Sequence, residues 1–123
     1  MHSLPLPHIR SVMIAAAAVL YAGILIGSLS TTIGPPSLFP YSDKVMHMAA
    51  WGLVAAIAAT LSRTVWIWLA VAAGLFASSA GVEWAQSFIP GRSASWQDLI
   101  ANATGIAVAG GFCALWARAR IKI

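Results

Sequence analysis

Residues 65–88 read VWIWLAVAAGLFASSAGVEWAQSF, an apolar stretch in which Glu83 is the single ionisable side chain. A helix needs roughly 20 apolar residues to cross the hydrocarbon core of a bilayer, and this stretch is long enough. Its glutamate lies near the C-terminal end, where a membrane-spanning helix approaches the headgroups. The stretch therefore predicts a transmembrane helix with a carboxylate close to one membrane surface.

The composition of the chain also indicates a membrane protein. Of 123 residues, 60% are hydrophobic and only 8% are charged, whereas a soluble domain carries about a quarter charged residues. The formal net charge is +4. The basic residues are scattered at the ends of apolar runs, so we expect no nucleic-acid partner. Cys113 is the single cysteine, which leaves no internal disulfide to form.

Three other apolar runs have the length of a membrane span. They cover residues 11–29, 44–61 and 96–116. The first could be a signal peptide with Arg10 as its positive flank. It is longer than the roughly 7–15 residues of a signal h-region, and Ser28-Leu29-Ser30 is a poor cleavage site. We expect it to be retained, so the sequence predicts an all-α integral membrane bundle of four transmembrane helices, forming a single domain over residues 1–123.

The connections between the runs predict how the helices follow one another. Ser62-Arg63-Thr64 is a tight turn, so the helices on either side form an antiparallel hairpin. Residues 31–42 contain several prolines and predict an extended loop. Pro90-Gly91 predicts a turn. Ser95 stands three residues before Asp98, a spacing that predicts a capping pair at the start of the last helix.

The distribution of lysine and arginine predicts the orientation. One side carries Arg10, Arg63, Arg118, Arg120 and Lys122. The other side carries Lys44 and Arg92. Cytoplasmic loops hold the excess of basic residues. We therefore expect a multi-pass membrane protein with both termini in the cytoplasm and the loops around Pro36 and Pro90 outside.

Tryptophans and small residues have plain structural interpretations. Tryptophans mostly lie towards the ends of the runs, which predicts an interfacial aromatic belt. They are Trp51, Trp66, Trp68, Trp84, Trp96 and Trp116. Small residues recur at a spacing of four, as at Gly23 and Gly27 or at Ala101 and Gly105, which would let helix backbones approach closely in lipid. An alanine-rich composition also produces this spacing by chance.

All three acidic residues lie at helix ends that face the same side of the predicted bundle. Asp43 and His47 are four apart and share a helix face. Asp43 could cap its helix and hold the imidazole, or the two could be an N-cap beside an interfacial histidine. Because hydrocarbon makes ionisable groups costly, a rim of carboxylates is a candidate functional site.

Glu83 belongs to a polar stripe with Ser79, Gln86 and Ser87. A carboxylate one turn inside an apolar helix needs a partner. The alternative is a glutamate that reaches the headgroups, but its side chain is short for that role. We therefore favour a functional role for Glu83, or a structural ion pair, over an interaction with headgroups.

Asp98 and Asn102 lie on the first turns of the last predicted helix. Asp98 suits the positive end of the helix dipole, and Asn102 must find a hydrogen bond across helices. Arg92 is expected to lie against at least one carboxylate, or else a headgroup. Lys44 adjoins Asp43 but is expected to point to another helix face.

Four blocks in order resemble the VanZ-like family of small bacterial membrane proteins. They are Asp43-Lys44-x-x-His47, Glu83-x-x-Gln86, Pro90-Gly91-Arg92 and Asp98-x-x-x-Asn102-x-x-Gly105. The resemblance covers about residues 43–110. The family is named for an accessory protein that raises teicoplanin resistance, a property that the resemblance does not carry to this chain. It implies that one family site is formed by Asp43, Lys44, His47, Glu83, Gln86, Arg92, Asp98 and Asn102.

Three classes of function fit these residues. The site could bind a lipid or cell-envelope ligand, with Arg92 and Lys44 taking a phosphate. It could belong to a membrane-embedded enzyme in which carboxylates and His47 supply acid and base or bind a metal, although no established nucleophile or metal signature is present. It could also only lock the helices together. Binding is favoured, and the sequence leaves catalysis, cofactor, metal and oligomeric state open.

Overall fold

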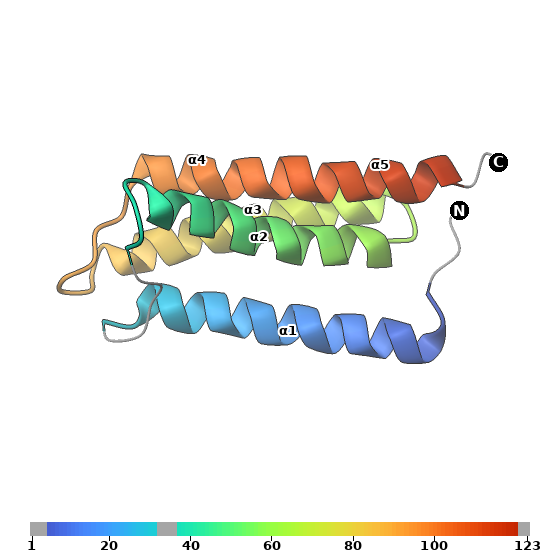
Figure 1. Cartoon of the computed structure of the whole chain (residues 1–123), viewed down its shortest axis with the longest axis horizontal. Coiled ribbons are helices and arrows are strands. Elements are labelled where there is room, and N and C mark those ends of the chain that lie inside the picture. Colours follow the sequence, from blue (N-terminus) through green and yellow to red (C-terminus); the bar gives the residue numbers. More distant parts are fainter. Residues whose placement is uncertain (1–4, 32–36, 121–123) are drawn as a thin grey trace.

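The fold, taken from a computed structural model, is described for residues 5–31 and 37–120. In this part of the chain every regular element is helical (Figure 1). The elements are α1 (Pro7–Leu29), α2 (Ser42–Leu61), α3 (Val65–Gln86), α4 (Trp96–Gly105), the π-helical turn η1 (Ile106–Gly110) and α5 (Gly111–Ala119). Gly34, Pro35 and Pro36 of the predicted loop, and Lys122, lie outside the described residues.

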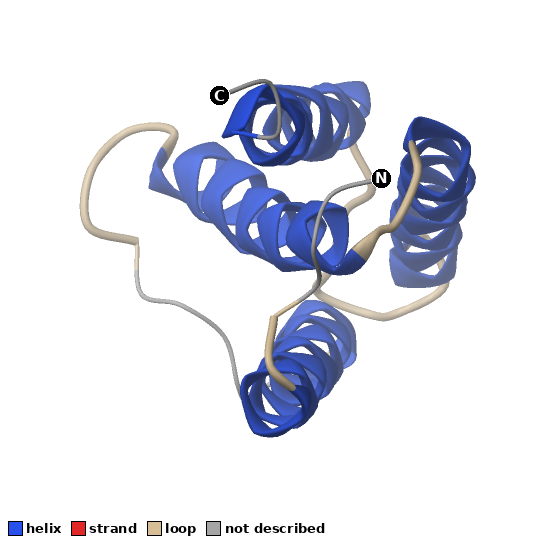
Figure 2. Ribbon diagram, turned by 90° about the vertical axis from the view of Figure 1, so that its right-hand side faces the viewer, coloured by secondary structure: helices blue, strands red, loops and turns tan. Residues whose placement is uncertain are grey.

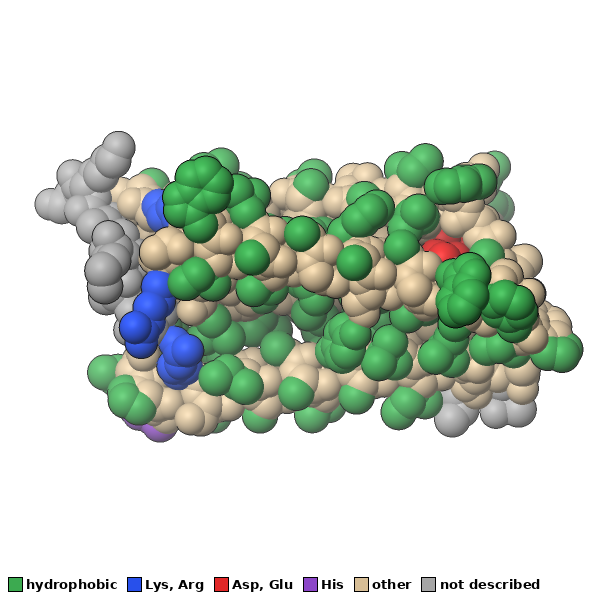
Figure 3. Space-filling model, turned by 180° about the vertical axis from the view of Figure 1, so that it is seen from behind, with side chains coloured by type: hydrophobic (Ala, Val, Ile, Leu, Met, Phe, Trp, Pro, Cys, Tyr) green, Lys and Arg blue, Asp and Glu red, His purple; other side chains and the backbone are tan. Residues whose placement is uncertain are grey.

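Four helices are long and apolar enough to cross a membrane, which confirms the predicted fold class. The last of them is continuous from Trp96 to Ala119 and comprises α4, η1 and α5. The first begins at Pro7, before the predicted Ser11, because proline is well suited to the first turn of a helix. Large apolar side chains cover the outside of the bundle, where they would face lipid (Figure 3).

Helix α2 lies at the centre and packs against all the other spans. The core consists of residues from α2, α3 and the last span: Trp51, Ala55, Ala59, Trp68, Val82, Ile106 and Ala114. Helix α1 contributes no buried residue, and the end-on view shows it set apart from the other three spans (Figure 2). The bundle is therefore a tight three-span core with α1 attached to its side.

Two tryptophans belong to this core, so the predicted interfacial belt is wrong for them. Trp51 is 1% exposed and Trp68 is 5% exposed. Trp51 meets Tyr21 of α1 edge-on. Trp68 packs over Gly110, where a Cβ atom would overlap its ring. The positions of the tryptophans in the sequence do not distinguish an indole that faces lipid from one that packs against a glycine of another helix.

Close backbone approach occurs where α2 crosses the last span. A Cβ atom on Gly105 would overlap the carbonyl oxygen of Met48, and one on Gly52 would lie 3.0 Å from the Gly105 oxygen. The predicted small-residue contact is thus confirmed at Gly105. At Gly23 and Gly27 a Cβ would meet nothing within 4 Å, so these glycines of α1 make no such contact.

The topology brings chemically different residues to opposite ends of the bundle. The described start of the chain, the α2–α3 turn and the end of α5 share one end (Figure 1). Blue lysine and arginine side chains gather at that end, and a red acidic side chain shows at the other (Figure 3). The second end, formed by the starts of α2 and α4 and the ends of α1 and α3, holds the candidate site.

Candidate functional site

Lys44, on the first turn of α2, bridges two carboxylates. Its Nζ atom lies 2.7 Å from Oδ1 of Asp98 on α4 and 2.9 Å from Oδ2 of Asp43. The Asp98 side chain is mostly buried, whereas that of Asp43 is 60% exposed. The prediction that Lys44 points away from Asp43 is therefore wrong. Its ammonium ends a flexible four-carbon stem, so the direction in which the side chain leaves the helix does not fix its partners.

His47 lies one turn further along α2 and faces α3 and α4. Its Nδ1 atom is 3.1 Å from Oδ1 of Asn102 and 3.9 Å from Oε1 of Glu83. The interpretation in which Asp43 holds the imidazole is wrong, because Asp43 pairs with Lys44. The predicted cap is wrong as well, because the N-cap of α2 is Tyr41 and Asp43 lies in the first turn. Asn102 is 1% exposed and makes the cross-helix hydrogen bond expected of a buried amide.

Glu83 lies inside the bundle, only 6% exposed, and so does not reach the headgroups. Its Oε2 atom accepts a hydrogen bond of 3.3 Å from the backbone N–H of Ser95, the N-cap of α4. The Ser95 hydroxyl accepts one of 3.0 Å from the N–H of Asp98, as predicted. In a capping box the second residue would reach back to the N-cap amide. Here Glu83 takes that amide, and Asp98 binds Lys44 instead.

Arg92 and Gln86 hold the C-terminal end of α1. Nε of Arg92 donates to the carbonyl of Ser30 and a terminal nitrogen donates to that of Gly27, both at 2.8 Å. Nε2 of Gln86 donates to the Ser28 carbonyl at 2.7 Å. The last carbonyls of a helix lack intrahelical partners and carry partial negative charge, which suits a guanidinium. These contacts replace the carboxylate pairing that the sequence led us to expect.

The part played by α1 is what sequence reasoning missed. The acceptors on α1 are backbone carbonyls, which any residue provides, so no residue type marks them. A second attachment, the hydrogen bond between the Tyr21 and Ser78 hydroxyls, does have a sequence signal. Each is a hydroxyl in the middle of an apolar run and needs a partner there.

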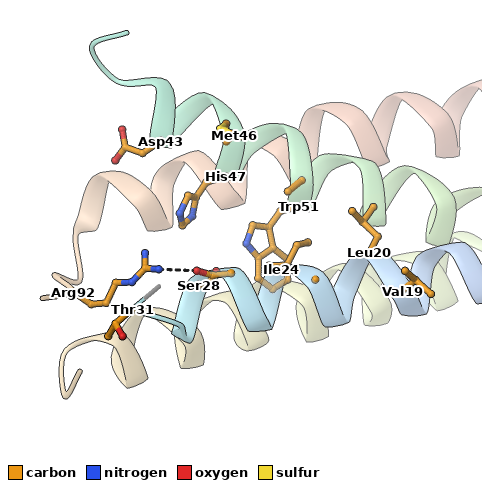
Figure 4. Close-up of a pocket in the computed structure, with 13 residues that line it drawn as sticks. Val19, Leu20, Ile24, Ser28, Thr31, Asp43, Met46, His47, Trp51 and Arg92 are labelled. Carbon is orange, nitrogen blue, oxygen red and sulfur yellow. Dashed lines mark hydrogen bonds between the residues drawn. The ribbon is translucent and has the colours of Figure 1, made fainter. Parts of the chain in front are cut away.

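A partly open groove of about 720 Å³ runs between α1 and α2. Asp43, His47 and Arg92 lie at one end, and Val19 and Leu20 lie at the other (Figure 4). Met46, Ile24 and Trp51 line the part between them. The groove therefore joins a charged end to an apolar channel. Its volume falls in the range of about 300–1,000 Å³ that is usual for ligand sites.

The structure places the candidate residues in two adjoining groups. One is a network of Asp43, Lys44, His47, Glu83, Asp98 and Asn102. The other is the pair that holds α1, Gln86 and Arg92. His47, Glu83 and Asp98 can each direct one ligand atom to a common point, with those atoms within 4.8 Å of one another. These three side chains could therefore hold a cation within the bundle, and the role of the site in function stays a prediction.

Comparisons with known proteins bear on the family. No curated protein and no solved structure matched the chain. The sequence model of the VanZ/LLP1 family matches residues 5–117, which is most of the chain and includes all four spans except the end of the last. The resemblance seen in the four sequence blocks is thereby confirmed. With its membrane-spanning helices and its polar residues gathered at one end, the chain belongs to the VanZ/LLP1 family.

Proposed function

We propose that this membrane protein binds a lipid, or a lipid-like molecule of the cell envelope, in the α1–α2 groove. The observation that carries the proposal is the polarity of the groove, charged at one end and apolar along its length. An amphiphile likewise has a polar or charged head and an apolar chain. Its head would lie beside His47 and Arg92, and its chain would lie along Val19, Leu20 and Ile24.

The walls of the groove support this choice of ligand. They are two membrane-spanning helices, so the apolar part lies at the depth of lipid chains. Helix α1 has no buried residue, and its C-terminal end is held by polar contacts from Arg92 and Gln86. Tyr21, Ile24 and Leu25 of α1 pack against the core and are only partly buried, so a hydrocarbon chain in the groove would bury more of the apolar surface of α1.

The proposed setting is the bacterial inner membrane, with the whole chain forming one transmembrane domain and both termini in the cytoplasm. The basic residues near the chain ends and the α2–α3 turn support this orientation. The groove's polar end would then lie at the outer leaflet, within reach of envelope lipids and their precursors.

A groove-filling variant tests the proposal. Gly23 lines the groove, and nothing lies within 4 Å of a Cβ built on it, so Gly23→Leu would add a side chain to the groove at a position that is open to a Cβ atom. Gly74 has the same open surroundings on α3 but does not line the groove, which makes Gly74→Leu the matched control. Phosphatidylglycerol added to detergent-purified protein should raise the melting temperature of the parent and of Gly74→Leu, and not that of Gly23→Leu. Equal stabilisation of all three would overturn the proposal.

A further inference from the structure

We propose that His47, Glu83 and Asp98 form a binding site for one divalent transition-metal ion, of which Zn²⁺ is the best fit. The three residues come from α2, α3 and α4, and each offers one ligand atom to a common point. Those atoms already lie within 4.8 Å of one another. The three-span core of the protein therefore brings the three ligands near one another, and small side-chain movements would bring them within bonding distance of one ion.

The donor set suits zinc chemically. Imidazole nitrogen together with carboxylate oxygen is a common zinc ligand set, with bonds of about 2.0–2.2 Å, so that two ligands of one ion lie at most ~4.4 Å apart. Nδ1 of His47 and Oε1 of Glu83 are 3.9 Å apart. Oδ1 of Asn102, 3.1 Å from the same nitrogen, is placed to be a fourth ligand. The proton that Nδ1 donates to this amide oxygen would move to Nε2 as the ion binds, so that Nδ1 becomes the ligand atom of a neutral imidazole.

An orphaned oxygen points independently to a ligand. Oε1 of Glu83 is buried and has no hydrogen-bond partner in the described part of the chain, although the residue is only 6% exposed. A buried carboxylate oxygen without a partner is costly. The other oxygen is satisfied by the Ser95 amide, which fixes the carboxylate with Oε1 turned towards His47. An ion beside Oε1 would satisfy it.

Lys44 is the cation that competes for this position. Its ammonium lies 2.7 Å from Oδ1 of Asp98 and balances part of the negative charge of the cluster. It is also bound to the exposed Asp43, so it can keep one partner when Asp98 turns to an ion. Replacing Lys44 with an uncharged side chain should therefore strengthen metal binding. If the network is only structural, no ion binds, and replacing Lys44 has no effect on metal content.

This inference goes beyond lipid binding and does not depend on it. His47 lines the groove as well as the cluster, so the ion would lie next to the proposed headgroup position. Glu83 and Asp98 do not line the groove. Metal binding can therefore be measured in detergent without added phospholipid, and its failure would leave the groove proposal standing.

The test uses the full chain, stripped with a chelator and equilibrated with Zn²⁺ or with Mg²⁺. Mass spectrometry of the metal should find about one Zn²⁺ per parent chain and far less Mg²⁺, which does not favour imidazole. Glu83→Gln and Asp98→Asn should each weaken zinc binding by roughly tenfold or more, since even outer-shell partners typically change it by about 10- to 100-fold. Lys44→Met should strengthen it severalfold.

His8→Ala is the control, because His8 is an exposed histidine on the first turn of α1, at the opposite end of the bundle. It should leave the zinc content unchanged. A parent chain that retains no Zn²⁺, or one whose zinc is lost in His8→Ala and kept in Glu83→Gln, would overturn the proposal. Co²⁺ absorption of the unmutated protein gives a second measurement that needs no variant. Bands typical of four-coordinate Co²⁺, displaced by Zn²⁺, are expected, and their absence counts against the site.

Discussion

At the scale of single residues, the site is held together by polar contacts that each join two helices. Glu83 from α3 accepts the N-cap amide of α4, and Lys44 from α2 takes the carboxylate that a capping box would have used. Each contact ties one helix end to another. The polar residues therefore tie α2, α3 and α4 to one another at this end, in addition to the close packing of α2 on α4.

The His47–Asn102 hydrogen bond should couple α2 to α4 measurably. Hydrogen bonds between membrane helices are worth about 0.6 kcal/mol on average and up to about 1.7 kcal/mol. A double-mutant cycle of His47→Ala and Asn102→Ala should therefore give a coupling energy of about 0.5–1.5 kcal/mol in the free energy of unfolding. The cycle of His8→Ala with Asn102→Ala should be additive. Additivity in both cycles would show that the observed contact contributes nothing.

The convergence of His47, Glu83 and Asn102 was predictable from the sequence, and the partners of Lys44 and Arg92 were not. Alternating spans bring His47, Glu83 and Asn102 to the same end, and few rotatable bonds separate their polar atoms from the backbone. Lys44 and Arg92 have long stems, so backbone position leaves their partners undetermined. Arg92 also donates to backbone carbonyls of α1, and every residue has such a carbonyl, so the sequence of α1 does not identify the acceptors.

At the scale of elements, the bundle combines tight and loose helix pairs. Helix α2 meets the last span through glycines, and the π-helical turn η1 follows Gly105 and ends at Gly110, which faces Trp68. Length and hydropathy predicted the four spans well, because lipid imposes both. They carry no information on the π-helical turn, since its extra residue changes neither the length of the apolar run nor its composition.

Gly105→Ala should destabilise the pairing of α2 with the last span. The new methyl group would overlap the Met48 carbonyl, a backbone atom that can yield only if the helices separate. Overpacking of this kind costs about 1–3 kcal/mol. Gly74→Ala, on an open face of α3, should instead be neutral or stabilising by up to about 1 kcal/mol, because alanine is the better helix former. Unfolding of both variants in detergent measures the difference, and equal stabilities would contradict the predicted close approach.

Arg92→Lys should loosen α1 almost as much as Arg92→Ala. A lysine cannot bind the Ser30 and Gly27 carbonyls through two edges of one planar group. The loss should be about 1.5–3 kcal/mol, the usual range for hydrogen bonds to charged groups. With Cys113 replaced by serine and cysteines at Tyr21 and Ser78, the yield with a short thiol crosslinker reports the attachment of α1. Arg63→Lys at the far end is the control. An unchanged crosslinking yield in Arg92→Lys would contradict the proposed role of Arg92 in holding α1.

At the scale of the whole molecule, the protein has two chemically distinct ends. Basic side chains near the described chain ends and the α2–α3 turn face one side, and the carboxylate network faces the other (Figure 3). In the orientation that we propose from the positive-inside rule, the site would lie at the outer face. The positions of the charged residues along the sequence were enough to predict this division, because apolar spans carry their charged residues at their ends and successive spans run in opposite directions.

Cysteine labelling checks the orientation in cells. With Cys113 replaced, single cysteines at the exposed positions Ser37 and Ser93 should react with an impermeant thiol reagent, while one at the exposed Thr64 should not. Thr64 is chosen over Ser62, which is buried and would escape labelling from either side. The reverse pattern would place both termini outside.

The central claim is that the α1–α2 groove holds a lipid, and native mass spectrometry of the protein released from mild detergent tests it most directly. We predict that the parent chain and Gly74→Leu each retain about one tightly bound lipid, and that Gly23→Leu, whose new side chain occupies the groove, retains none under the same conditions. The same lipid on all three proteins, or on none of them, would contradict the account.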